Sequence, residues 1–118
     1  MFYGCRHIYK LLKSLKLKEG WDGEGGRAPY KRDVKNAIVF MKYLPYEGIR
    51  KARVAIAGDG AVGFDWRYDN IVFEAEFNDG DIAYFAKMED GSERGGEYKF
   101  EGQATNDLLE LIEMHFGK

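Results

Sequence analysis

Three carboxylates, Asp65, Glu74 and Glu76, are the residues whose types and spacing come nearest to a chemical site. Asp65 is predicted to lie across a strand pair from Glu74, with Glu76 two residues further along the same face. Paired carboxylates can act as general acid and base or as metal ligands, but this chemistry needs a pocket and a raised pKa on one partner. We expect an open sheet face to offer neither. The protein is therefore predicted not to be an enzyme.

A glycine-rich loop carries two more carboxylates, Asp22 and Glu24, that could bind a cation. A calcium loop of the EF-hand type needs further oxygen ligands and a terminal Glu at a fixed spacing, and the sequence lacks them. We instead expect Asp22 to accept hydrogen bonds from loop amides and Trp21 to be buried as an anchor. The single cysteine, Cys5, excludes an intramolecular disulfide and a thiolate cluster for zinc or iron–sulfur. No metal is predicted.

The segment from Gly58 to Gly63 matches a literal G-x-G-x-x-G after an apolar strand. A dinucleotide site needs a helix directly after these glycines, because the helix N-terminus meets the pyrophosphate. The residues from Phe64 to Tyr68 instead alternate like a strand. We therefore predict no nucleotide at this segment and no cofactor in the protein.

Basic side chains gather in the first half of the chain. The whole chain has a net charge of −2, but residues 1–56 carry +8 and residues 57–118 carry −10. The halves could pack together and neutralise each other, or the protein could present a basic helical side to an acidic partner or an acidic sheet side to a basic one. The basic side would hold six residues of two helices: Arg6, Lys10, Lys13, Lys31, Arg32 and Lys35. Because no aromatic residues are interleaved with the lysines, we favour a solvated surface for the first helix.

Apolar residues spaced three and four apart predict three helices. The first runs from about residue 3 to residue 17, Pro29 opens the second and Pro45 stops it, and the third begins near Thr105 and ends at Gly117. A basic connector is expected over residues 46–52. The residues expected to be buried are, helix by helix, Ile8, Leu11, Leu12 and Leu15, then Val34, Ala37, Ile38, Met41 and Leu44, and last Leu108, Leu109, Ile112 and Phe116.

Between residues 53 and 101, apolar and polar residues alternate between turn signals, which predicts an antiparallel meander. Two-residue turns at Asp69-Asn70 and Asp79-Gly80 define the registers of the central strands. The two registers agree in placing the large apolar side chains on one face, whereas a slip of one residue would scatter them over both.

The ends of the meander are less regular. The first hairpin could close with a two-residue or a three-residue loop. We take the three-residue loop, in which Gly60 is left-handed and Arg53 lies opposite Asp65. Residues 89–96 lack apolar side chains and are expected to form a mobile loop before a short last strand at a sheet edge.

These elements predict an α+β fold with two layers, an antiparallel meander of about five strands with two N-terminal helices and one C-terminal helix on one face. The chain of 118 residues is expected to form a single domain over residues 1–118. No apolar run approaches the roughly 20 residues of a membrane span, so we expect a cytoplasmic protein without a membrane partner.

The segment from Gly20 to Gly26 reads G-W-D-G-E-G-G and is followed by Pro29. With the helix and meander after it, this segment resembles a widespread group of small uncharacterised bacterial proteins that carry G-W-D-G-x-G-A-x-x-P in the same place. The likeness covers most of the chain, although its specific part is this short segment, and Gly26 stands where those proteins more often have Ala. The resemblance supports the architecture and implies no activity.

These observations favour a small non-enzymatic protein-interaction module, such as an inhibitor, an antitoxin, an immunity protein or an anti-defence factor of a phage or mobile element. The predicted partner surface is the open sheet face, with its carboxylates and exposed apolar residues: Asp65, Glu74, Glu76, Phe85 and Val72. A basic partner protein could dock there through Arg or Lys. The alternative is nucleic-acid binding by the six residues of the basic side, with an affinity that falls steeply with salt.

Overall fold

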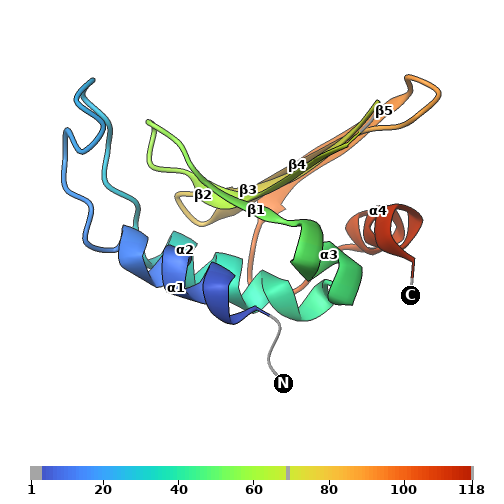
Figure 1. The fold of residues 1–118 in the computed structure, drawn as a ribbon, viewed down its shortest axis with the longest axis horizontal. Coiled ribbons are helices and arrows are strands. Elements are labelled where there is room, and N and C mark those ends of the chain that lie inside the picture. Colours follow the sequence, from blue (N-terminus) through green and yellow to red (C-terminus); the bar gives the residue numbers. More distant parts are fainter. Residues whose placement is uncertain (1–3, 69, 118) are drawn as a thin grey trace.

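The computed structural model describes residues 4–68 and 70–117, which form four α-helices and a five-stranded antiparallel sheet. The elements, in chain order, are α1 (Cys5–Ser14), α2 (Lys31–Phe40), a 3-10 turn (Met41–Tyr43), α3 (Tyr46–Lys51), β1 (Arg53–Ile56), β2 (Val62–Tyr68), β3 (Ile71–Asn78), β4 (Asp81–Lys87), β5 (Glu93–Lys99) and α4 (Asn106–Phe116). The strands follow each other in the order β1-β2-β3-β4-β5, so β1 and β5 form the two edges. Figure 1 shows the four helices below the sheet.

The registers of the two central strand pairs are confirmed. Trp66 lies opposite Phe73 between β2 and β3, and Phe77 lies opposite Ile82 between β3 and β4. All four side chains are buried, as the predicted apolar face requires. The turn predicted to begin at Asp69 includes a residue outside the described part of the chain.

The first hairpin has the predicted three-residue loop. Gly60 takes a φ of +88°, and the Ala57 amide donates to the Ala61 carbonyl at 2.9 Å. Glycine suits this position because a Cβ would strain the left-handed backbone. Arg53 consequently lies opposite Asp65. Strand β2 follows the loop directly, where a dinucleotide-binding site would need a helix.

The core lies between the sheet and the helices. Trp66 is among its largest fully buried side chains, and its ring stacks on Phe73 with 5.0 Å between the ring centroids. The indole Nε1 donates to the Gly48 carbonyl of α3 at 2.7 Å. The ring of Phe116 in α4 lies 5.2 Å from the same indole. One side chain of β2 therefore contacts two helices.

Helix α1 packs on a narrower strip than predicted. Leu11 is buried and Ile8 is partly buried, whereas Leu12 is 49% exposed and Leu15 is 39% exposed. The buried strip runs through Leu11 and Ser14, because α1 contacts only the short edge strand β1 and helix α2 closely. The apolar pattern of the sequence therefore overstated the burial of this helix.

Helix α2 buries two residues that the apolar pattern did not include. Phe40 is fully buried beside the predicted Val34, whereas Ile38 is only partly buried. Asp33 is also fully buried, because its carboxylate accepts two hydrogen bonds from the backbone of the β3–β4 turn. This charged residue, which the sequence analysis did not assign to either side of the helix, thus belongs to the interior.

Helix α3 replaces the connector predicted after Pro45. Glu47 lies in its first turn and Arg50 in its last, which suits the helix dipole. Gly48 is buried against α4, where a Cβ would come within 3.1 Å of the Phe116 ring. This helix of six residues is too short for an apolar period to show in the sequence.

Strand β5 begins earlier than predicted, so part of the segment expected to be a mobile loop joins the sheet. The strand runs over Glu93–Lys99 and pairs with β4 along its length. Gly95 permits this close approach, because a Cβ there would lie 2.6 Å from the Tyr84 carbonyl oxygen. The predicted position of this strand at a sheet edge is confirmed.

Helix α4 begins and ends as predicted. The Thr105 hydroxyl accepts a hydrogen bond from the Leu108 amide at 3.3 Å, and Gly117 follows the helix with a φ of +71°. Its buried residues include Leu111, whereas Leu109, predicted to be buried, is 38% exposed. The core therefore contacts a stripe spaced three and four residues apart rather than two adjacent leucines.

Candidate functional site

Two of the three carboxylates predicted to bind a partner are paired within the sheet. Arg53 of β1 binds Asp65 of β2 through two hydrogen bonds of 3.0 and 3.1 Å. Arg67 contacts Glu74 at 3.3 Å. The register places Arg53, Asp65 and Glu74 in one row across three strands. Because a partner would compete with these pairs, Asp65 and Glu74 offer less charge than the sequence indicates.

Of the three predicted carboxylates, Glu76 is the one without a cationic partner among the described residues. Within the described residues its side chain forms no hydrogen bond or ion pair. Desolvation by its neighbours raises the pKa of Glu76 although the side chain is exposed, and the nearby carboxylates of Asp59 and Glu74 raise it further. The expectation that this face provides no raised pKa is therefore wrong.

The hollow beside Glu76 is small. Gly63, which has no side chain, lies among its lining residues, and the volume is about 50 Å³. That is room for one or two water molecules, since each occupies about 30 Å³ in the liquid. Pockets that bind small molecules enclose roughly 300–1,000 Å³. Glu76 therefore has a raised pKa, but the hollow beside it is smaller than the pocket that acid–base catalysis needs.

Replacing Glu76 by Gln should stabilise the folded protein by about 0.2–1 kcal/mol at neutral pH, the size of an exposed charge interaction. The pKa of Glu76 is raised above its ordinary value of 4.5 in the folded state, so the folded protein binds the proton more tightly than the unfolded one. Stability from this group is therefore lost as the pH rises through the raised pKa, and the advantage of Gln should shrink below about pH 4.5. Urea denaturation at acidic and neutral pH measures both values. An unchanged difference between the two proteins would contradict this expectation.

The apolar residues predicted for the partner surface do not form a continuous patch. Phe85 is half-buried and lies opposite Glu74. Val72 is also half-buried and lies between Arg67 and Lys87. A partner would meet isolated apolar contacts at this face, without the apolar centre of a typical interface.

The six residues predicted for the basic side separate into two groups. The three from α1 line a groove between α1 and β1: Arg6, Lys10 and Lys13. The three from α2 are not among the residues that line this groove. Among them, Arg32 forms an ion pair with Asp79, while Lys31 and Lys35 are exposed.

The α1–β1 groove has a volume of about 700 Å³, within the range of roughly 300–1,000 Å³ found for ligand pockets. Five cationic side chains line it: Arg6, Lys10, Lys13, Lys16 and Arg53. The described lining contains no Asp or Glu, and Leu17, Ala52, Val54 and Ile56 supply apolar surface. The groove thus combines an apolar floor with an excess of positive charge.

The cations of α1 are brought together by helix geometry. Arg6, Lys10 and Lys13 are spaced by four and three residues, so they share one flank of the helix, where like charges repel. In the part of the chain that the structure describes, none of the ion pairs involves these three residues. Lys10 Nζ contacts the Val54 carbonyl oxygen of β1 at 3.4 Å. This flank therefore faces the groove with charge that no carboxylate offsets.

Two further groove cations, Lys16 and Arg53, are missing from the predicted set of six. Lys16 follows Lys13 by three residues, and this spacing places it on the same basic side of the predicted first helix. Arg53 lies in β1, far away in the sequence, and only the packing of α1 beside β1 brings it to the groove. No sequence signal connects it to the helix.

Two aromatic side chains also line the groove. Tyr9 is 65% exposed, and Lys13 Nζ lies 5.6 Å from its ring centroid. The expectation that no aromatic residue accompanies these cations is therefore wrong. His7 lies 2.6 Å from the Ile49 carbonyl oxygen through Nε2 and so ties α1 to α3.

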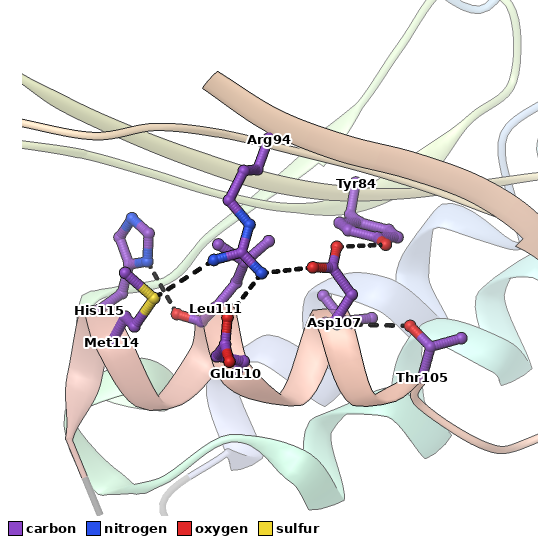
Figure 2. Close-up of polar contacts among 9 residues, drawn as sticks. Tyr84, Arg94, Thr105, Asp107, Glu110, Leu111, Met114 and His115 are labelled. Carbon is purple, nitrogen blue, oxygen red and sulfur yellow. Dashed lines mark hydrogen bonds and ion pairs between the residues drawn. The ribbon is translucent and has the colours of Figure 1, made fainter. Parts of the chain in front are cut away.

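A separate group of titratable side chains joins the β4–β5 hairpin to α4 (Figure 2). Arg94 of β5 forms ion pairs with Asp107 and Glu110 of α4, the second at 2.8 Å. The Tyr84 hydroxyl of β4 donates to Asp107 at 2.8 Å. Arg94, followed by Tyr84, lowers the pKa of Asp107. Because these groups bind one another, we interpret the cluster as a clasp between hairpin and helix.

The glycine-rich loop is closed by its own hydrogen bonds. The Asp22 carboxylate accepts from the amides of Glu24 at 2.9 Å and Gly26 at 2.7 Å, and these bonds lower the pKa of Asp22. This is the role predicted for Asp22. Trp21 is only half-buried, and its Nε1 donates to the Arg27 carbonyl at 3.0 Å. It is therefore less buried than predicted.

In residues 4–68 and 70–117, no group of three or more His, Cys, Asp or Glu side chains is placed to hold a metal ion. Within the same residues, no helix has the length and apolar character needed to cross a membrane. Comparison with known proteins found no matching family model, no matching curated protein and no matching solved structure.

Proposed function

We propose that the protein is a small non-enzymatic interaction module of the cytoplasm, and that it binds an acidic partner protein in the α1–β1 groove. The observation that supports this most directly is the concentration of four cationic side chains, Arg6, Lys10, Lys13 and Lys16, beside an apolar floor, without a carboxylate among the described lining residues. Arg53 also lines the groove, but Asp65 already pairs with its charge. An inhibitor, an antitoxin, an immunity protein or an anti-defence factor would act in this way.

An acidic partner gains from the groove through two effects. Clustered cations attract an anion over a distance and increase its association rate. A carboxylate that enters the groove also relieves the repulsion among Arg6, Lys10 and Lys13. The apolar floor adds about 25 cal/mol for each Å² of apolar surface that the partner covers. A segment with both acidic and apolar side chains therefore fits the groove better than a purely ionic ligand.

Replacing Arg6 and Lys13 by Glu together should weaken the binding of a fluorescein-labelled peptide of alternating Glu and Val by about 100-fold. Two attractive contacts become repulsive, and each change of about 1.4 kcal/mol corresponds to a tenfold loss. Fluorescence anisotropy at low salt measures the affinity. Binding should also weaken as salt screens the charges.

The matched control is the variant in which Lys31 and Lys35 of α2 are both replaced by Glu. It changes the net charge by the same amount, but at two residues that are not among those lining the groove. We expect its affinity to stay close to that of the original protein. An equal loss in both variants would show that net charge alone attracts the peptide and would rule out the groove. Circular dichroism establishes that both variants remain folded.

Nucleic-acid binding is the second candidate, and the exposed ring of Tyr9 beside Lys13 is the observation that favours it. Exposed aromatic side chains among cations can stack on bases of single strands. An oligonucleotide of the same charge as the labelled peptide should compete poorly if a protein is the partner, because it cannot cover the apolar floor as the peptide does. Displacement of the peptide at a lower concentration of oligonucleotide would favour nucleic acid instead.

The sheet face remains a separate proposal for a basic partner, through the residues predicted from the sequence: Asp65, Glu74, Glu76, Phe85 and Val72. With Asp65 and Glu74 already paired to arginines, Glu76 is the carboxylate most open to a partner cation. Replacing Glu76 by Arg should leave binding of the acidic peptide in the groove unchanged.

A further inference from the structure

We infer that the acidic partner binds in this groove as an added β-strand on the free edge of β1. The inference rests on the proposed function of the groove. Strand β1 is an edge strand, with β2 as its neighbour in the sheet. Edge strands present backbone amides and carbonyls to an incoming strand. The groove lies along this edge, because residues of β1 and of α1 line it together.

Two hydrogen bonds define where the backbone groups of β1 point. The Ala57 amide, directly after β1, donates to the Ala61 carbonyl on the β2 side. Because backbone groups alternate sides along an antiparallel strand, those of Val54 and Ile56 point away from β2. Lys10 Nζ contacts the Val54 carbonyl oxygen from that side at 3.4 Å. Val54 and Ile56 therefore direct their amides and carbonyls toward the groove.

Lys10 lies where an amide of the incoming strand would bind. Its contact with the Val54 carbonyl, at 3.4 Å, is longer than the usual range of about 2.7–3.2 Å and is easily displaced. A lysine at a sheet edge discourages unselective strand pairing. When an acidic strand binds, one of its carboxylates can pair with the Lys10 ammonium. A backbone amide of the strand then replaces Lys10 as the donor to the Val54 carbonyl oxygen. The edge of β1 therefore selects acidic strands over neutral or basic ones.

Alternation also determines which partner side chains meet the cations. Partner side chains level with Val54 would point to the side of the sheet on which the helices lie (Figure 1). The groove residues on this side include the apolar floor and the α1 cations. Those level with Arg53 would point to the outer face, where Arg53 is already bound to Asp65. An extended segment with acidic residues at every second position is therefore the expected partner sequence, with the methylene groups of the Glu side chains over the apolar floor and their carboxylates at the cations.

The test uses the full-length protein and the labelled peptide of alternating Glu and Val, with two methylated versions of that peptide. One version is N-methylated at every Glu amide and the other at every Val amide, so all three carry the same charge. In an added strand, only one of the two amide sets faces β1. One methylated peptide should therefore lose about tenfold or more in affinity, while the other binds like the parent. Hydrogen exchange of the Val54 and Ile56 amides should slow when the parent peptide binds.

Equal affinities for the two methylated peptides, with unchanged exchange at Val54 and Ile56, would overturn strand addition and leave the proposed binding of an acidic partner in the groove in place. Absence of binding by the parent peptide would overturn the proposed function itself. Equal binding by a peptide of alternating Lys and Val would do the same, because charge would then play no part. The two failures are thus distinguishable in one set of titrations.

Discussion

Replacing Asp33 by Ala is expected to lower the free energy of unfolding by about 2–4 kcal/mol. The carboxylate is fully buried, and its two oxygens accept hydrogen bonds from the amides of Asp79 at 2.7 Å and Gly80 at 2.8 Å. Both turn residues have positive φ, 52° and 90°, so the turn depends on bonds that hold its backbone. Each donor left without a partner costs about 1–3 kcal/mol, and water reaches part of this turn. Urea denaturation monitored by circular dichroism measures the loss.

Two further variants separate the buried bonds from the exposed ion pair of the same turn. Asp33→Asn keeps one acceptor oxygen and should lose roughly half as much stability. Arg32→Ala removes the exposed ion pair with Asp79 and should cost less than about 1 kcal/mol. If Asp33→Ala cost no more than Arg32→Ala, the carboxylate would not hold the turn.

Replacing Trp66 by Ala is expected to cost about 3–5 kcal/mol, the usual loss for a large buried aromatic side chain. The indole contacts Phe73 of β3 and Phe116 of α4, and its Nε1 donates to the Gly48 carbonyl of α3. The substitution therefore leaves a cavity and a carbonyl without its donor. Denaturation in urea measures the change.

Trp66→Phe is the informative companion, because it keeps a buried aromatic ring of smaller volume and removes the donor to Gly48. We expect it to lose less stability than Trp66→Ala, by about the cost of one buried hydrogen bond plus a small cavity. Leu109→Ala in α4 serves as the control, since Leu109 is 38% exposed and should tolerate truncation. A comparable loss from Leu109→Ala would contradict the placement of the core around Trp66.

The sheet could be predicted from the sequence because its signals are local. Alternation fixes the face of each side chain, and the turn at Asp79-Gly80 sets the register of the hairpin around it, so Phe77 is predicted opposite Ile82 without tertiary information. The extent to which α1 is buried could not be predicted in the same way. Its leucines follow a helical period, yet how wide a strip is buried depends on how much of the sheet lies beneath the helix.

The groove could be predicted only in part. The spacing of Arg6, Lys10 and Lys13 places them on one helix flank. Their proximity to Val54 arises from packing between segments more than forty residues apart, as the Lys10 contact with a separation of 44 residues shows. The pairing of Asp65 with Arg53 followed from the register, but whether the carboxylate remained available to a partner depended on the arginine side chain.

Asp33 illustrates a further limit. The charge of Asp33 favours the solvated side of the helix, whereas its spacing of four residues from Ala37 places it on the apolar side. The residue is buried because the β3–β4 turn, brought over α2 by the fold, presents two amides to it. Buried carboxylates of this kind become apparent only when the distant backbone that satisfies them is known.

The central claim is that acidic segments bind between α1 and β1. The most direct test is a titration of the ¹⁵N-labelled protein with unlabelled peptide, monitored by two-dimensional ¹H–¹⁵N NMR. With the peptide of alternating Glu and Val, we predict the largest shifts at the amides of Val54 and Ile56 and along α1 from Arg6 to Lys13. Glu76 and Phe85 on the sheet face should shift little. Largest shifts on the sheet face, or along α2 at Lys31 and Lys35, would contradict the claim.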